Sequence, residues 1–360
     1  MPGGTAVAAL GLARGLGVLD DVDVVGVSAK HRGLPGEPWR PRMPIASFPM
    51  PRSVLYEAWH GMRWPEIERA TGPVDVVHAT TLIVPPARAP LVVTIHDLAF
   101  LADPDQMTSR GSRFMRRGLE LARTHADLVV CSSEATRGDC VTAGIDESRL
   151  RVVLLGADAQ PASLDAIAAA KQRFALTHPY VVWVGTVEPR KNVPGLLAAF
   201  AAVARDHPDH ELVLVGPKGW GPQLDELLAA FEGDVTARVR ALGFLSDDDR
   251  GAVMAGAAAL CYPSTREGFG LPVLEAMVQG TPVVTSSGTA TEEVAAGAGM
   301  LVDPASSDAI ADGLRQVLDD DALADRLSAA GRERAAELTW ERCAAHTRDV
   351  YREVAMTASR

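Results

Sequence analysis

Residues 266–275 read Arg-Glu-Gly-Phe-Gly-Leu-Pro-Val-Leu-Glu, and they indicate the fold more clearly than any other part of the 360-residue chain. The apolar run at residues 257–262 predicts a buried strand before them, and Pro272 stands where a helix is expected to begin. A strand, a glycine-bearing loop and a helix therefore follow one another. The backbone amides of residues 268–271 would point out of the helix N-terminus, where the helix dipole favours an anion.

Two carboxylates accompany this loop. Glu267 precedes the glycines, and Glu275 follows after seven intervening residues, in what we expect to be the first helical turn. A carboxylate there can accept two hydrogen bonds from a sugar diol. The alternative is a tight turn followed by an acid that the helix dipole stabilises.

The surrounding chain alternates short apolar runs with segments that have a helical pattern. The predicted strands are residues 22–27, 74–78, 91–95, 128–132, 151–155, 180–184, 211–215, 239–244, 257–262, 282–285 and 300–302. Nearly continuous Val, Ile and Leu indicates strands buried on both faces, as in parallel sheets covered by helices. We therefore expect two doubly wound, Rossmann-like α/β domains, with ligands at the carboxyl ends of their strands and a cleft between the facing sheets. The predicted seam lies near residues 156–179.

Composition narrows the class of protein. The hydrophobic fraction of 47% and charged fraction of 22% are typical of a globular chain, and the length suggests two domains. The net charge of −11 argues against a general nucleic-acid binder. We find no apolar run long enough to span a membrane, no signal peptide, and no metal-ligand spacing among the four cysteines. These features predict a cytoplasmic enzyme.

A second stretch, residues 188–192, reads Glu-Pro-Arg-Lys-Asn and follows the predicted strand at 180–184. Arg190 and Lys191 would lie at the carboxyl end of that strand, where two cations can neutralise a diphosphate. Asn192 is a plausible N-cap for the next helix. The alternative is a solvated basic turn.

A third candidate is His96, which follows the predicted strand at 91–95 and is followed by Asp97. The histidine can donate a hydrogen bond to a phosphate or a sugar hydroxyl, with Asp97 to orient it. The alternatives are a structural histidine and an aspartate that caps the next turn.

The three stretches, in this order, resemble retaining glycosyltransferases of family 4, which have the GT-B fold. The resemblance runs from residue 2 to the end. The matching pieces are Pro-Gly-Gly at 2–4, Thr-Ile-His-Asp-Leu-Ala-Phe at 94–100, Glu-Pro-Arg-Lys-Asn at 188–192, Gly-Pro at 216–217, Gly-Phe at 243–244, Glu-Gly-Phe-Gly-Leu-Pro at 267–272 with Glu275, Pro-Val-Val at 282–284 and Thr-Trp-Glu-Arg at 339–342. The chain departs from the family at its start, because the first strand of the N-terminal domain has no counterpart before the glycines.

The resemblance implies a role for each part. It implies an N-terminal acceptor-side domain at residues 1–175, a nucleotide-sugar-binding domain at residues 176–339, and a last helix at residues 340–360 that crosses back to the first domain. The implied contacts are Arg190, Lys191, Gly3 and Gly4 to the donor diphosphate; Gly268, Phe269, Gly270, Leu271 and Glu275 to the donor sugar and ribose; Gly243 and Phe244 to the nucleobase; and His96 and Glu267 at the reaction centre.

The implied reaction is the retaining transfer of a hexose from a nucleotide sugar, with no metal or other cofactor. The implied acceptor is a glycan or lipid-linked molecule in surface polysaccharide or glycoconjugate synthesis. The motif variants are most similar to those of bacterial mannosyl- and rhamnosyltransferases, so the leading donor is GDP-mannose.

Other functions remain open at this point. A metal-dependent transferase would need an Asp-x-Asp pair, and the pairs Asp21/Asp23 and Asp103/Asp105 do not end buried strands. A nicotinamide dehydrogenase would need a complete GxGxxG motif, which the chain lacks. A pseudo-glycosyltransferase that binds glycan or a partner, a nucleotide-sugar epimerase and a phosphorylase stay as alternatives.

One helix suggests a further partner. Arg110, Arg113, Arg116, Arg117 and Arg123 fall on one side of a predicted helix. A basic amphipathic helix in an acidic protein can rest on an anionic membrane at the inner face of the plasma membrane and collect lipid-linked acceptors. The alternative is an ordinary solvated helix face.

Overall fold

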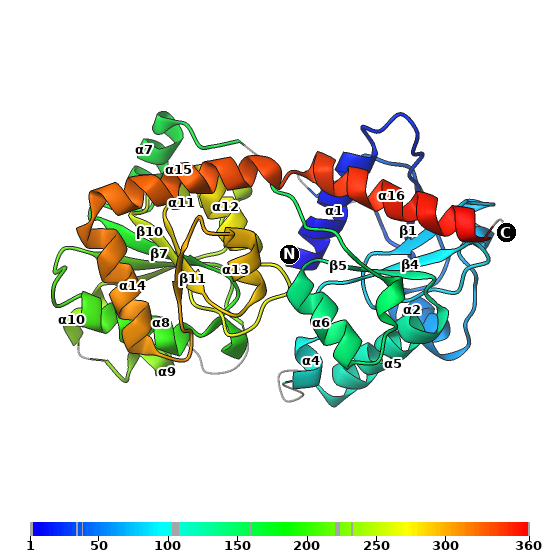
Figure 1. Cartoon of the computed structure of the whole chain (residues 1–360), viewed down its shortest axis with the longest axis horizontal. Coiled ribbons are helices and arrows are strands. Elements are labelled where there is room, and N and C mark those ends of the chain that lie inside the picture. Colours follow the sequence, from blue (N-terminus) through cyan, green and yellow to red (C-terminus); the bar gives the residue numbers. More distant parts are fainter. Residues whose placement is uncertain are drawn as a thin grey trace. The chain divides into compact units, whose positions relative to one another are not determined.

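The computed structural model describes residues 3–33, 35–37, 39–102, 108–158, 160–219, 224–231 and 233–358. The chain forms two compact units, one of Met1–Gly156 with Thr339–Arg360 and one of Ala157–Leu338 (Figure 1). The predicted boundary at residue 175 is therefore too late. Helix α7 (Leu164–Arg173) belongs to the second unit because it packs on α11 (Asp247–Ala255).

The second unit contains one parallel six-stranded sheet in the order β12-β11-β10-β7-β8-β9. Its strands are β7 (Tyr180–Val184), β8 (Glu211–Val215), β9 (Val239–Gly243), β10 (Ala259–Tyr262), β11 (Val283–Ser286) and β12 (Met300–Val302). All residues of β7, β10 and β11 are buried, as the continuous apolar runs predict.

Helices cover both faces of this sheet (Figure 1). Helix α8 (Val193–Val203) packs against α14 (Ser307–Asp319) on one face. On the other face α11 and α15 (Asp321–Glu337) both pack against α12 (Leu271–Gln279). The remaining helices of this unit are α9 (Leu224–Leu228), α10 (Gly233–Ala237) and α13 (Ala290–Ala295). The second unit is therefore doubly wound.

The first unit divides its strands between two parallel sheets. The larger sheet has the order β3-β4-β5-β6, and β1 pairs with β2 in a separate sheet. The strands are β1 (Gly26–Ser28), β2 (Ile45–Ser47), β3 (Val77–Ala79), β4 (Leu91–Ile95), β5 (Leu128–Cys131) and β6 (Leu150–Val152). Among the described residues, helix α1 (Gly4–Leu16) precedes every strand.

Helix α16 (Trp340–Ala358) completes the first unit by packing along α1 (Figure 1). The contact is close because α1 presents glycines there. A Cβ added to Gly11 would stand 2.2 Å from the ring of Trp340, and one added to Gly15 would stand 2.4 Å from its carbonyl oxygen. The other helices of this unit are α2 (Arg52–Gly61), α3 (Glu68–Thr71), α4 (Ala99–Ala102), α5 (Ser109–His125) and α6 (Glu134–Thr142).

In the described part of the chain, no helix is long and apolar enough to cross a membrane. The same residues contain no cluster of His, Cys, Asp and Glu that could hold a metal ion. Of the Asp-x-Asp pairs considered from sequence, Asp103 and Asp105 lie outside the described residues.

Candidate active site

The strand order of the second unit marks the position of a ligand site. Strand β7 comes first in this sheet's sequence and lies between β8 and β10, so the chain winds in opposite directions on its two sides. Ligands of such sheets bind outside the carboxyl ends of the strands at this switch point. The segment that follows β7 contains Arg190 and Lys191, and the segment that follows β10 contains Glu267.

The loop after β7 is held in place by Asn192. This residue has left-handed backbone angles, with φ 53°, and caps α8 by accepting a hydrogen bond from the Gly195 amide. Its side-chain nitrogen donates to the carbonyl of Pro263 at 3.1 Å, in the loop after β10. The predicted N-cap therefore also joins the two loops. The Thr265 amide adds a bond of 2.9 Å to the carbonyl of Arg190.

Arg190 and Lys191 converge on the carboxylate of Glu267. Arg190 Nη1 donates to Oε2 at 2.8 Å, and Lys191 Nζ donates to Oε1 at 2.6 Å. Arg190 Nε also donates to the carboxylate of Glu188 at 3.0 Å. The hydroxyl of Tyr262 donates to Oε1 of Glu267 at 2.9 Å and accepts a short hydrogen bond from Lys191. Two cations and two carboxylates thus form one network, in which the side chain of Glu267 is 6% exposed.

Burial and charge act in opposite directions on this network. Burial alone would raise the pKa of Glu267, but Lys191 and Arg190 outweigh it and lower the pKa to about 2. Burial lowers the pKa of Lys191, and the Glu267 carboxylate opposes that shift. Burial, then the Glu267 charge, raises the pKa of Tyr262 well above its usual value, so Tyr262 remains a neutral donor.

Helix α12 begins beside this network. Gly270 precedes it with φ +104°, and a Cβ there would stand 2.6 Å from Thr291 Cγ2, so both the turn and the packing require glycine. The helix begins at Leu271, one residue earlier than predicted, so Pro272 is its second residue and not its first. Phe269 is 4% exposed and packs in the core, so its side chain cannot line an open site.

Glu275 differs from its predicted position. Because α12 begins at Leu271, Glu275 is its fifth residue and lies in the second turn rather than the first. Arg250 of α11 donates to its carboxylate at 3.0 Å and to Asp247 at 2.7 Å. Burial raises the pKa of Glu275, and Arg250 opposes this shift. Arg250 therefore favours the ionised form, which can accept hydrogen bonds from a diol.

The predicted nucleobase contacts lie at the end of β9. Gly243 has φ +70°, and its carbonyl accepts a hydrogen bond of 2.8 Å from the Gly216 amide. The Phe244 side chain is 42% exposed, an unusual position for a large apolar group. Helix α11 begins three residues after Phe244, at Asp247, and contains Arg250.

In the first unit, His96 lies after β4 and is half-buried. Its Nε2 is 3.2 Å from the carbonyl oxygen of Thr80, which can only accept, so Nε2 carries the proton. Burial lowers the pKa of His96, which is therefore neutral at physiological pH. Asp97 accepts a hydrogen bond from the Ala99 amide at 3.0 Å and so caps the next turn, the alternative considered from sequence.

Gly3 and Gly4 form the start of α1. Gly3 is the N-cap, and its carbonyl accepts a hydrogen bond from the Ala6 amide at 2.9 Å. Gly3 and Gly4 are exposed, and among the described residues a Cβ added to Gly3 would meet nothing within 4 Å. An open N-terminus with exposed amides can receive an anion.

The structure therefore brings Arg190, Lys191 and Glu267 into direct contact, whereas Glu275 contacts Arg250 instead. Sequence reasoning missed two of the groups involved, Tyr262 and Arg250. Tyr262 ends a predicted buried strand, and this position at the switch point could have drawn attention to it. No local signal indicates the bond between Arg250 and Glu275, which are 25 residues apart.

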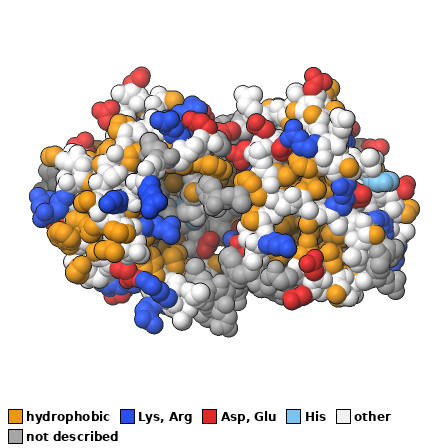
Figure 2. Space-filling model, turned by 180° about the vertical axis from the view of Figure 1, so that it is seen from behind, with side chains coloured by type: hydrophobic (Ala, Val, Ile, Leu, Met, Phe, Trp, Pro, Cys, Tyr) orange, Lys and Arg blue, Asp and Glu red, His pale blue; other side chains and the backbone are white. Residues whose placement is uncertain are grey.

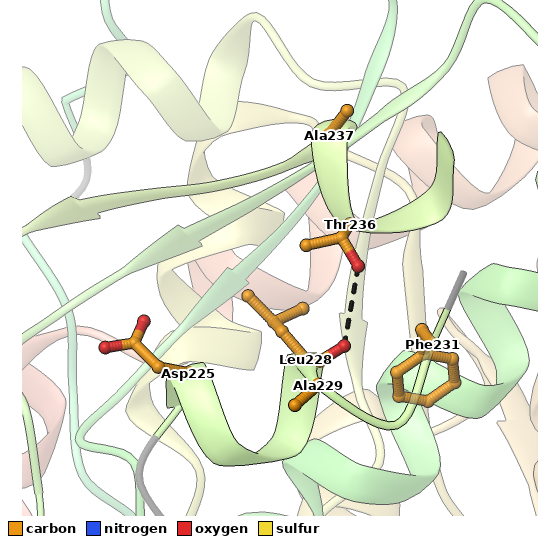
Figure 3. Close-up of a pocket in the computed structure, with 6 residues that line it drawn as sticks. All are labelled: Asp225, Leu228, Ala229, Phe231, Thr236 and Ala237. Carbon is orange, nitrogen blue, oxygen red and sulfur yellow. Dashed lines mark hydrogen bonds between the residues drawn. The ribbon is translucent and has the colours of Figure 1, made fainter. Parts of the chain in front are cut away.

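A hollow of about 540 Å³ lies elsewhere in the second unit (Figure 3). It is lined by Asp225, Leu228, Ala229, Phe231, Thr236 and Ala237 of α9, α10 and the segment between them. It contains no cation among its lining residues and none of the predicted site residues. Its chemistry does not suit a diphosphate.

Two family models cover most of the chain. The model of Glycosyltransferase Family 4 matches residues 2–160, and the model described as Glycosyl transferases group 1 matches residues 166–334. The chain is 31% identical over 283 residues to O-antigen chain mannosyltransferase B of Escherichia coli, with 77% of this chain and 74% of that protein covered. It is 29% identical to the MMP alpha-(1->4)-mannosyltransferase of Mycolicibacterium hassiacum, with 85% and 76% covered.

Solved structures share the fold. Alr3699/HepE of Anabaena, in complex with UDP and glucose, superimposes with a TM-score of 0.73 at 20% identity and 97% and 96% coverage of the two chains. WaaG, a glycosyltransferase involved in lipopolysaccharide biosynthesis, gives a TM-score of 0.73 at 18% identity and covers 98% and 97%. With two Rossmann-like units and both family models matched, the chain belongs to glycosyltransferase family 4, the retaining transferases of the GT-B fold that take a sugar from a nucleotide sugar.

Proposed function

We propose that this enzyme transfers mannose from GDP-mannose to a glycan or lipid-linked acceptor in bacterial surface polysaccharide synthesis, without a metal ion. The observation that carries the proposal is the convergence of Arg190 and Lys191 beside the N-terminus of α12, at the switch point of the second sheet. Cations and helix amides are the groups that bind a diphosphate in proteins. The two relatives named as mannosyltransferases support mannose as the transferred sugar.

The proposed role of Arg190, Lys191 and the amides at the start of α12 is to stabilise the leaving group. When the bond between the anomeric carbon and the diphosphate oxygen breaks, negative charge accumulates on the diphosphate. Arg190, Lys191 and the α12 amides would stabilise this charge without reorganisation, because the loop bonds already fix them. The acceptor hydroxyl would attack on the face that the diphosphate leaves, and a phosphate oxygen would take its proton.

We propose roles for the other predicted residues as well. Glu267 would orient both cations and accept a hydrogen bond from the donor sugar. Glu275, paired with Arg250, would accept hydrogen bonds from the ribose hydroxyls. His96, which is neutral, would hydrogen-bond a sugar hydroxyl, and Gly3 and Gly4 would approach the phosphate through their amides.

A donor panel tests this proposal. The chain is incubated with GDP-mannose, UDP-glucose, ADP-glucose and dTDP-rhamnose in EDTA, and release of each nucleoside diphosphate is measured with and without a mannan acceptor. We expect release from GDP-mannose above all others, and loss of it in Lys191→Ala. A different preferred donor would contradict the assignment of mannose, and no release from any donor would favour a pseudo-glycosyltransferase.

We propose further that helix α5 rests on an anionic membrane from the cytoplasmic side. Arg113 and Arg116 are exposed on this helix, whereas Gly118, Leu119, Leu121 and Ala122 of the same helix are buried. The neighbouring segment after α2 exposes Met62 by 72% and Trp64 by 48%. Basic and amphipathic aromatic side chains are the groups that bind an anionic bilayer surface. On the first unit, Lys and Arg side chains lie among hydrophobic ones (Figure 2).

Vesicle sedimentation tests the membrane contact. We expect binding to phosphatidylglycerol vesicles at low salt, weaker binding as salt rises, and little binding to phosphatidylcholine. The double substitution Arg113→Glu and Arg116→Glu should abolish binding. The double substitution Arg205→Glu and Arg326→Glu, at exposed positions of the second unit, serves as a control of equal charge change. Equal binding of both variants would contradict the proposed surface.

The free cysteines, which are all buried, agree with a reducing compartment.

A further inference from the structure

The hydroxyl of Tyr262 lies within the cation network but has no role in the proposed reaction. Tyr262 ends β10 and is completely buried. Its hydroxyl donates to Glu267 Oε1 at 2.9 Å and accepts from Lys191 Nζ, and that nitrogen also lies 4.9 Å from the centroid of the ring. Lys191, Tyr262 and Glu267 therefore form a closed triangle of hydrogen bonds.

This triangle restricts the lysine more than a single ion pair would. An ammonium group has three N–H donors, and it can rotate about its bond to Cε. Two of the donors are directed to Glu267 Oε1 and Tyr262 Oη. Two fixed acceptors determine the rotation of the group and therefore the direction of its third N–H. Among the described residues, no further acceptor of Lys191 is found.

We infer that Tyr262 is a positioning residue, which with Glu267 fixes two N–H directions of Lys191 and so directs the third to the donor diphosphate. The inference rests on the proposed function, because Lys191 must contact the diphosphate for its direction to matter. A lysine that is fixed before the donor binds needs no reorganisation as charge develops on the leaving group.

The variant Tyr262→Phe removes the hydroxyl but keeps the ring, and so keeps the core packing and the contact of the ammonium with the ring face. Leaving-group charge is larger in the transition state than in the bound donor, so a misdirected lysine lowers kcat more than it raises KM. We expect kcat for GDP release from GDP-mannose to fall roughly 10- to 100-fold, the range for loss of a hydrogen bond to a charged group. The KM for the donor should change less than about threefold.

Tyr180→Phe is a matched control. Tyr180 is also completely buried, and its hydroxyl donates to the carbonyl of Val253 at 2.7 Å. It begins the neighbouring strand β7, and the ammonium of Lys171 lies 5.9 Å from its ring centroid. Both variants lose one buried hydroxyl in the same sheet, but only Tyr262→Phe removes a bond to Lys191. Tyr180→Phe should keep the kcat of the wild type.

A double-mutant cycle separates positioning from general stability. If Tyr262 acts through Lys191, adding Tyr262→Phe to Lys191→Met should lower kcat by less than about twofold more. Full additivity of the two effects, or equal kcat values for Tyr262→Phe and Tyr180→Phe, would overturn the inference while an active wild type leaves the proposed function intact. A wild type that releases no nucleoside diphosphate from any donor would overturn the proposed function, and the inference with it.

Discussion

Replacing Glu267 by glutamine should destabilise the second unit in a manner that depends on pH. The substitution keeps the shape of the side chain and removes the charge that pairs with Arg190 and Lys191. The pKa of Glu267 is about 2 in the folded chain against an ordinary value of 4.5. A difference of about 2.5 units corresponds to about 3 kcal/mol of folding free energy, at 1.36 kcal/mol per unit.

The direction follows from proton binding. A carboxyl group with a lower pKa in the folded than in the unfolded chain binds protons more weakly when folded. Its contribution is complete above pH 4.5 and is lost as the pH falls towards 2. At pH 7 the wild type should therefore be more stable than Glu267→Gln by about 3 kcal/mol, or roughly 6–12 °C in Tm for a unit of this size. The difference should narrow below pH 4.5.

Urea unfolding of both proteins from pH 7 to pH 2.5 measures this difference. Glu337→Gln is the control in the same unit, because Glu337 pairs with Arg334 at 2.8 Å but its side chain is 58% exposed. An exposed pair of this kind contributes at most about 1 kcal/mol. The reasoning is refuted if Glu267→Gln costs no more than Glu337→Gln at pH 7, or if its deficit stays constant down to pH 2.5.

Three further predictions concern other contacts. Gly11→Ala should destabilise the first unit by about 2 kcal/mol in thermal unfolding, because the added Cβ would overlap the ring of Trp340. The control Gly138→Ala, in a helix with open space around the glycine, should be neutral or stabilising, and equal effects of the two substitutions would contradict the close packing of α1. Arg250→Leu should weaken GDP binding in calorimetry by roughly tenfold, because Arg250 favours the ionised form of Glu275. The affinity should recover as the pH is raised and Glu275 ionises, and weakening that is independent of pH would count against the coupling of Arg250 to Glu275. Glu267→Gln should bind GDP more weakly than the wild type, because the side chain no longer orients Arg190 and Lys191 as an anion. Unchanged or tighter GDP binding in calorimetry would argue against that orienting role.

Much of the sheet in the second unit could be predicted from sequence, because β7, β8, β10 and β11 are buried along all or nearly all of their length. The predicted strands at 180–184, 211–215 and 300–302 coincide with β7, β8 and β12. The first unit was less regular. The strand predicted at 22–27 begins only at Gly26, because residues 21–25 include two aspartates in a segment of exposed and half-exposed residues.

The location of the candidate site could be predicted from sequence, because it depends on where the parallel strands end. Parallel strands bring their carboxyl ends to one edge, so the loops with Arg190, Lys191 and Glu267 meet at the switch point. The ion pairs within the site were not predictable, because they depend on side-chain directions across loops 76 residues apart in sequence. The second-turn position of Glu275 was missed because the start of a helix is uncertain by a few residues in any sequence pattern.

The central claim is that Arg190, Lys191 and the N-terminus of α12 bind the donor diphosphate without metal. Calorimetric titration of GDP, in EDTA, into the wild type and Lys191→Met tests it most directly, since the variant keeps most of the side-chain length and loses the charge. We expect one GDP per wild-type chain and at least about tenfold weaker binding in the variant. Absence of binding by every nucleoside diphosphate in EDTA, or equal affinity of the two proteins, would contradict it.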